Sequence, residues 1–99
     1  MAPRFVFTDF DWDTGNVDHL WERHQVTPEE VEEVFAGRFR WRRGQTKKGI
    51  QYYEGLGQTQ TGRYLAVIFQ IKKSCIVRAA SSRPMSSAER KWYDKAIGP

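Results

Sequence analysis

The run Tyr64-Leu65-Ala66-Val67-Ile68-Phe69 decides the fold of this 99-residue chain. Six consecutive apolar residues, four of them β-branched or aromatic, are typical of a strand that is buried on both faces. We therefore predict that residues 63–72 form a central strand and that the rest of a sheet is built around it.

The sequence on either side of this run predicts further strands separated by short polar turns. Phe39 and Trp41 alternate with arginines, which is typical of a strand with one apolar face. Residues 45–49 are expected to form a turn, residues 50–56 a second strand, residues 57–62 another turn and residues 75–80 a fourth strand. Residues 5–7 are either a short strand or an apolar lead-in. The expected sheet has three or four antiparallel strands joined by hairpins.

Three helices are predicted from their start signals. Asp13 is expected to cap a short amphipathic helix over residues 14–24. Thr27-Pro28-Glu29-Glu30 has a capping threonine, a proline at the first helical position and a glutamate three residues after the cap, so a second helix should run to about Ala36. Gly37 is expected to close it in the left-handed conformation.

The third helix is predicted near the C-terminus, where Ser86 and Glu89 have the spacing of a capping box and the helix should reach about Ile97. The expected order is therefore two helices, four strands and one helix. This is an α+β fold in a single domain, residues 1–99, with the helices packed on one face of the sheet.

Composition favours a polyanionic partner and excludes several other classes. A net charge of +4 and a pI near 9.5 suit phosphate neutralisation, although a basic balance can also simply keep a protein in solution. Cys75 is the only cysteine, and neither histidine lies in a cluster with zinc-ligand spacing, so no disulfide, metal or cofactor is expected. No segment resembles a signal peptide or reaches transmembrane length, which predicts a cytoplasmic protein with no membrane partner.

Arginines near the ends of the last two predicted strands are candidates for holding a phosphate. A guanidinium offers a planar fork of donors and keeps its proton. We predict that Arg63, Arg78 and Arg83 hold the scissile phosphate of a nucleic acid. The alternative is that these arginines are solvated or paired with carboxylates, which is the ordinary state of surface arginine.

Metal-free RNA cleavage also needs a base for the 2′-hydroxyl and an acid for the leaving 5′-oxygen. His24 titrates near neutral pH and could serve as either, or it could cap the end of the first helix. Glu54 is the alternative base, although a strand glutamate is usually a salt-bridge partner. Tyr93 could donate a proton or stack on a base, or it could belong to the core.

A basic run after the second helix is the candidate RNA-binding segment. Cations for the backbone beside aromatic rings for stacking suit single-stranded RNA. The alternative is an edge strand whose charges prevent aggregation. The candidate RNA-binding residues of this run are Arg38, Arg40, Trp41, Arg42, Arg43, Lys47 and Lys48.

Several short motifs in matching order resemble the BrnT family of bacterial toxins. They are Phe10-Asp11-Trp12-Asp13, residues 23–35 with Arg23-His24 at their start, a Gly62-Arg63 turn, residues 78–83, and Glu89-Arg90-Lys91-Trp92-Tyr93. The resemblance covers nearly the whole chain. It implies a RelE-like, metal-independent endoribonuclease toxin. The implied partners are an RNA substrate and a neutralising BrnA-like antitoxin with a ribbon-helix-helix part, through which alone the toxin would meet DNA.

The chain departs from the family pattern at two places. It has Asn16-Val17 where the family usually has Lys-Asn, and His24-Gln25 where it commonly has His-Gly. Three hypotheses remain open on the sequence. The protein is a ribonuclease toxin, a module that binds RNA or an antitoxin without cleaving, or an interaction protein that acts only in a repressor complex with a DNA-binding partner.

Overall fold

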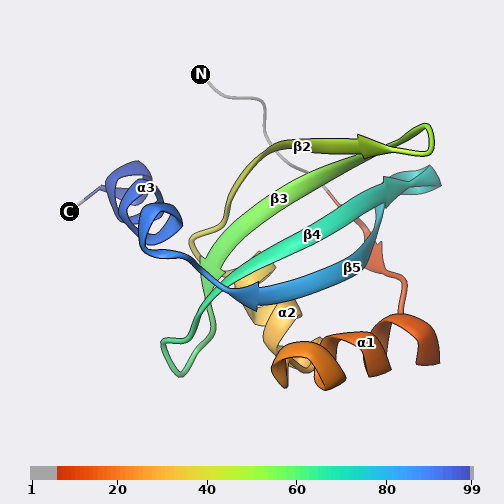
Figure 1. Cartoon of the computed structure of the whole chain (residues 1–99), viewed down its shortest axis with the longest axis horizontal. Coiled ribbons are helices and arrows are strands. Elements are labelled where there is room, and N and C mark those ends of the chain that lie inside the picture. The colour runs from red at the N-terminus through yellow and green to blue at the C-terminus, as the bar shows by residue number, and fades with distance from the viewer. Residues whose placement is uncertain (1–6, 99) are drawn as a thin grey trace.

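The predicted central strand lies in the middle of a five-stranded open sheet in the computed structural model, which describes residues 7–98 (Figure 1). Across the sheet the strand order is β1-β5-β4-β3-β2. The strands are β1 (Asp9–Phe10), β2 (Arg40–Lys47), β3 (Ile50–Gln58), β4 (Tyr64–Lys72) and β5 (Ile76–Pro84). Three helices complete an α+β fold: α1 (Thr14–His24), α2 (Pro28–Ala36) and α3 (Ser87–Ile97). A short 3₁₀ turn, η1 (Lys73–Cys75), joins β4 to β5.

The expectation of three or four antiparallel strands is wrong, because β1 adds a fifth strand and pairs in parallel with β5. Asp9 lies opposite Ile76 and Phe10 opposite Val77. A two-residue strand has no periodicity to read, and its partner lies more than sixty residues away along the chain. Of the possible strand at residues 5–7, residues 5 and 6 lie outside the described part of the chain, and Phe7 precedes β1.

Three strands also extend further than predicted, and β3 does so by two residues, to Gln58. β2 continues to Lys47, and the turn to β3 is only Lys48 and Gly49, with φ of 51° and 79°. Positive φ at both positions is what the type I′ turn of a two-residue hairpin requires. β5 continues past Ala80 to Pro84 because its polar end pairs with β4, where Arg83 lies opposite Ala66.

All three predicted helix starts are confirmed. Asp13, Thr27 and Ser86 each accept a hydrogen bond from the backbone N–H three residues on, and each belongs to a complete capping box. The predicted left-handed Gly37 is wrong, since its φ is −91°. A left-handed residue closes α1 instead of α2: Gln25, with φ 49°.

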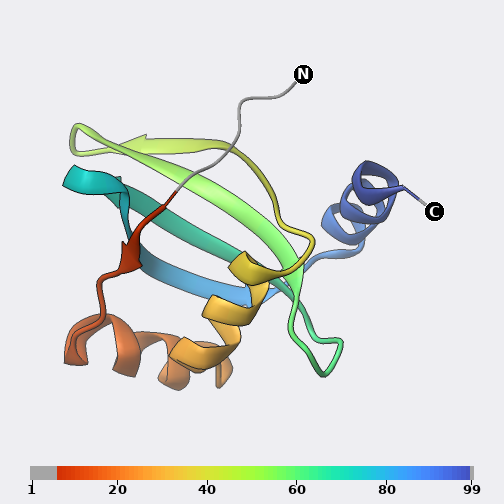
Figure 2. The same ribbon diagram turned by 180° about the vertical axis from the view of Figure 1, so that it is seen from behind.

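The main core lies between the sheet and the pair α1 and α2 (Figures 1 and 2). On β4, Leu65, Val67 and Phe69 point toward this pair, because alternate side chains of a strand face the same side. The α1 and α2 residues of this core are Leu20, Val31, Val34 and Phe35.

The expectation that all helices pack on one face is wrong for α3. Its Tyr93 is buried against Leu56 and Ala66, which belong to the opposite face of the sheet, and its hydroxyl donates to the carbonyl of Arg38. α3 covers only one end of that face, so Ala66 is buried while Ile68 stays half-exposed. Only the first part of β4 is therefore buried on both faces. Much of the sheet face opposite α1 and α2 is not covered by a helix. Among residues 7–98 no helix is long and apolar enough to cross a membrane.

Candidate functional site

The uncovered part of the second sheet face, beside α3, holds the candidate site. We call this surface the open face and define it by Tyr52, Glu54, Ile68, Ser81 and Arg83. A hollow of about 440 Å³ lies on it. Its lining comes from β2, β3, β4 and β5: Gly44, Gln45, Lys47, Tyr52, Tyr53, Glu54, Ile68, Ala80, Ser81 and Arg83.

Strand register explains why charged side chains gather at this hollow. Arg42 on β2 lies opposite Glu54 on β3, and Glu54 lies opposite Ile68 on β4. Ile68 lies opposite Ser81 on β5, and Arg83 follows two positions later on the same side. Directly opposed residues share a face, so the row crosses four strands. The sequence alternation predicted such faces, but only pairing brings these residues into one row.

Arg42 and Glu54 form the first ion pair of the site. Arg42 Nη2 lies 2.7 Å and Nε 3.2 Å from Glu54 Oε1. The guanidinium also lies over the ring of Trp92 on α3, 5.1 Å from the ring centroid. The side chain of Arg42 is 43% exposed and that of Glu54 is 19% exposed. Glu54 therefore has its carboxylate at the hollow, with a half-exposed cation that solvent or a ligand can reach.

Arg83 and Glu89 form the second pair, and it is bidentate. Arg83 Nη1 and Nη2 lie 2.6 and 2.8 Å from the two carboxylate oxygens of Glu89, which also accepts from the backbone N–H of Ser86. The hydrogen bonds from Arg83 are the main cause that lowers the pKa of Glu89 to about 2, against an opposing effect of burial. The same contact is the main cause that raises the pKa of Arg83, and the charge of Glu54 adds to it. The two pairs are thus electrostatically connected across the open face.

We predict that the Arg83–Glu89 pair makes the fold acid-labile. The pKa of Glu89 is lowered from 4.5 to about 2, so the pair contributes stability above pH 4.5 and loses it as the pH falls toward 2. The contribution is on the order of 2 kcal/mol, since only 10% of the Glu89 side chain is exposed. Urea unfolding at a series of pH values checks this. The stability gap between the parent and Glu89→Gln should shrink between pH 5 and pH 2, and a constant gap would contradict it.

Arg78 lies further along β5, beyond a bulge at Ala80, and it has different partners. Its Nη1 lies 2.8 Å from Asp13 Oδ2 and 3.3 Å from Asp11 Oδ2. The hydrogen bond from Arg78 is the main cause that lowers the pKa of Asp13, and Lys72 does the same for Asp11. Arg78 therefore holds the segment before α1 against the sheet.

A smaller hollow of about 300 Å³ beside Arg78 adjoins the first one. Its lining includes Asn16, His19 and Gln70, and it shares Tyr52 and Ala80 with the larger hollow. Asn16 has a structural role there, since its amide donates to the carbonyls of Asp11 and Ala79. The two hollows together thus extend from near α3 to the start of α1, with Tyr52 between them.

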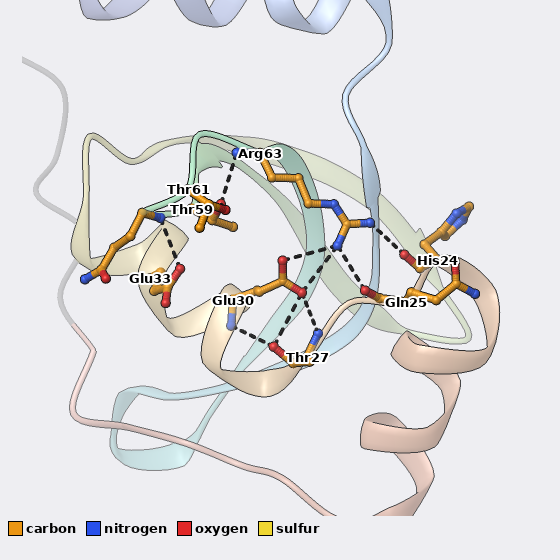
Figure 3. Close-up of polar contacts among 9 residues, drawn as sticks. His24, Gln25, Thr27, Glu30, Glu33, Thr59, Thr61 and Arg63 are labelled. Carbon is orange, nitrogen blue, oxygen red and sulfur yellow. Dashed lines mark hydrogen bonds and ion pairs between the residues drawn. The ribbon is translucent and has the colours of Figure 1, made fainter.

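Arg63 does not lie on the open face, so the predicted convergence of three arginines is not found. Its guanidinium donates to the carbonyls of His24 and Gln25, at 2.7 and 2.9 Å, and pairs with Glu30 at 3.2 Å (Figure 3). Glu30 in turn accepts from the backbone of Thr27. Arg63 closes the C-terminal end of α1 and joins it to α2, a role that its position in the sequence did not reveal.

The predicted result of removing Arg63 is a loss of stability. In Arg63→Met the two carbonyls and Glu30 lose a charged donor, so the free energy of unfolding should fall by about 2 kcal/mol. Denaturant unfolding measures the loss, and Arg63→Lys should recover part of it. A stable Arg63→Met variant with impaired RNA cleavage would instead assign Arg63 to the chemistry.

His24 and the aromatic candidates lie away from the hollow. His24 contributes its carbonyl to the Arg63 cluster (Figure 3), and its imidazole is half-buried at the end of α1. Trp41 points to the helix face, where it contacts Tyr53 edge to face. Tyr93 is 1% exposed. Stacking on a ligand therefore has to come from other rings than Trp41 and Tyr93.

The basic run lies on β2, an edge strand, as the alternative interpretation required. Of its predicted RNA-binding residues, Lys47 lines the hollow, and Arg42 binds Glu54 at its edge. Arg40 shares their face by register, opposite Leu56. The remaining cations, Arg38, Arg43 and Lys48, are exposed outside the hollow lining.

Sequence reasoning missed three residues of the candidate site, Tyr52 on the open face and Glu89 and Trp92 on α3. Tyr52 is two positions before Glu54 on one strand, so alternation alone could have placed the two on the same side. Glu89 was predicted as part of a helix cap, and it shares with Trp92 a motif of the family resemblance, but neither was a candidate site residue. Their contacts with Arg83 and Arg42 depend on where α3 packs, which no local pattern encodes.

No protein-family model matches the sequence, and no curated protein matches it either. Within residues 7–98, no three histidine, cysteine, aspartate or glutamate side chains gather in a group that could hold a metal ion. The site is therefore characterised by its own geometry: two arginine–carboxylate pairs and a tyrosine around a hollow on a sheet face.

Proposed function

We propose that this protein is a BrnT-like, RelE-like endoribonuclease toxin that cleaves RNA on the open face without a metal ion. The observation that carries the proposal is the placement of Glu54 between Arg42 and Arg83 at a solvent-accessible hollow. A carboxylate for proton transfer and guanidinium groups for a phosphate are two of the three parts that phosphodiester cleavage through the 2′-hydroxyl needs, the third being an acid for the leaving oxygen. The resemblance of the sequence motifs supports the same class.

In the proposed reaction, the Glu54 carboxylate accepts the proton of the 2′-hydroxyl, and the 2′-oxygen attacks the phosphorus. Arg83 and Arg42 stabilise the charge on the phosphoryl oxygens. The bond to the 5′-oxygen breaks, and Tyr52, at the meeting point of the two hollows, supplies the proton to that oxygen. The products are a 2′,3′-cyclic phosphate and a 5′-hydroxyl, and proton exchange with water returns Glu54 to the carboxylate and Tyr52 to the phenol, so no co-reactant is needed.

To bind Arg42 and Arg83, an incoming phosphate has to replace Glu54 and Glu89 as their ion-pair partners. The Arg42–Glu54 pair is the easier one to open, because Arg42 is 43% exposed and a pair of this kind is worth about 0–1 kcal/mol. Releasing Arg42 from Glu54 also frees the carboxylate to accept a proton. When Arg42 moves from Glu54 to the phosphate, it therefore binds the substrate and activates Glu54 as the general base in the same step.

The test is incubation of the purified protein with single-stranded RNA in excess chelator. We expect fragments with 2′,3′-cyclic phosphate ends, and a loss of about a hundredfold or more in rate for Glu54→Gln at an unchanged thermal midpoint. Gln70→Ala, a matched open-face control that lines only the smaller hollow, should cleave as fast as the parent. The absence of metal-independent fragments, or a Glu54→Gln variant as fast as the parent, would reject the enzyme.

A second candidate function, a module that binds RNA or an antitoxin without cleaving, is favoured by one specific observation. Arg42, Arg78 and Arg83 all have carboxylate partners already, so the open face is largely charge-compensated. RNA binding without fragments would support this candidate. In either case we propose a cytoplasmic protein whose antitoxin is a BrnA-like ribbon-helix-helix protein, with DNA contacted only through that partner.

A further inference from the structure

Trp92 on α3 is a large aromatic side chain that the packing of its helix does not use. Tyr93, Met85 and Ile97 make the apolar contact with Leu56 and Ala66 of the sheet. Trp92 instead remains 38% exposed. Its ring meets the guanidinium of Arg42, which lies 5.1 Å from the ring centroid.

Arg42 connects this ring to the proposed chemistry. The guanidinium that lies over Trp92 is the one that binds Glu54 Oε1 at 2.7 Å. A single side chain, Arg42, therefore lies between the aromatic ring of Trp92 and Glu54, the proposed general base. A nucleotide whose phosphate occupies the hollow would have its base within reach of this surface.

We infer that Trp92 and Arg42 form a stacking platform for one base of single-stranded RNA, next to the scissile phosphate. The inference rests on the proposed function and names the substrate class and a positioning residue for it. An indole ring and a guanidinium plane both stack on bases, and the bases of a duplex do not expose their faces for such contact. Stacking accepts every base, so the platform selects unpaired RNA rather than a sequence.

The platform also explains a difference between the tryptophans. Trp12 donates a hydrogen bond to Glu32, and Trp41 contacts Tyr53 on the helix face, so each has a structural contact. Trp21, on α1, is 53% exposed and lies on the helix side of the sheet, away from the hollow. Trp21 is therefore a matched control for the loss of an exposed indole.

The experiment measures binding of 2′-O-methyl oligoribonucleotides, which cannot be cleaved through the 2′-hydroxyl. One set carries a single abasic nucleotide at each position in turn. For the parent protein we expect one position at which the abasic nucleotide weakens binding by about tenfold, the scale of one lost stacking contact. Trp92→Ala should bind the intact strand about tenfold more weakly and no longer discriminate at that position.

Three variants keep the result interpretable. Trp92→Phe retains a ring and should keep most of the affinity and the discrimination. Trp92→Leu retains apolar bulk for α3 and should lose both, at a thermal midpoint close to that of the parent. Trp21→Ala should bind like the parent. A Trp92→Leu variant that binds the intact strand as tightly as the parent and still discriminates the abasic position would overturn the inference.

Failure of the proposed function gives a different result. If the parent protein binds none of the strands, the open face is not an RNA surface and both proposals fall. If the parent binds and cleaves RNA but no abasic position matters, the function stands and the platform is wrong. If a hairpin duplex of the same length binds as tightly as the single strand, selection of unpaired RNA is wrong as well.

Discussion

Replacing Arg83 by lysine is expected to slow single-turnover RNA cleavage by about a hundredfold while the fold stays intact. Lysine keeps one charge near Glu89, so most of the ion pair should survive. It cannot reproduce the fork with which Arg83 holds two oxygens at 2.6 and 2.8 Å, and a phosphate in the transition state requires the same fork. About a hundredfold corresponds to the loss of one preorganised donor, on the order of 3 kcal/mol.

The alanine variant is less informative by itself. Arg83→Ala leaves the Glu89 carboxylate, whose side chain is 10% exposed, without its cation, so stability should fall together with rate. Glu89→Gln is the control, because it breaks the same ion pair and leaves the guanidinium in place. It should be less stable than the parent at pH 7 and still cleave. If Arg83→Lys cleaves like the parent, or if Glu89→Gln is as slow as Arg83→Lys, Arg83 acts through structure alone.

Gly55→Ala is expected to cost about 2 kcal/mol of stability, which lowers the thermal midpoint by roughly 10 °C. Gly55 is buried in the middle of β3. A Cβ added there would lie 2.5 Å from Cε2 of Phe39 and 3.1 Å from Cε1 of Phe69. Phe39 has little room to retreat, since its ring stacks on Phe35 with 4.3 Å between centroids. Thermal unfolding of the variant measures the effect.

A compensating change tests whether the clash with Phe39 is the cause. Phe39→Leu shortens the side chain that the new methyl group would meet. The cost of Gly55→Ala should therefore be smaller in the Phe39→Leu background than in the parent, so the two substitutions should not be additive. Equal costs in both backgrounds, or a Gly55→Ala variant as stable as the parent, would show that the sheet relaxes around the methyl group.

The helix starts were predictable because their causes are local. Thr27 and Glu30 complete a capping box within one turn, and the same holds for Ser86 and Glu89. The end of α1 at His24 agrees with the predicted range, but the contacts that close the helix there were not predictable in this way. Gln25 takes the left-handed conformation there, and the distant Arg63 satisfies the carbonyls of His24 and Gln25.

For the candidate site, composition and alternation indicated some of the right residues and not their arrangement. Glu54 and Arg83 were candidates from the sequence, and both lie at the hollow. Arg63 was grouped with them because it precedes a neighbouring strand, yet its side chain reaches the helix layer. The alternation of side chains along a strand predicts which face of the sheet a residue lies on, but not which distant residue it contacts there.

The sequence by itself determined the elements of this protein: an α+β chain with three capped helices, an apolar central strand and a basic strand. These follow from local hydrogen bonding and side-chain alternation within a few residues. Only the tertiary structure decided that α3 packs on the second face, that β1 joins β5 in parallel, and that Trp92 meets Arg42 beside Glu54. Such contacts join residues that are far apart along the chain, so no local pattern encodes them. The meeting of Trp92 with Arg42 follows from the burial of Tyr93 against Leu56 and Ala66, which places α3 at one end of the sheet and leaves the rest of that face open.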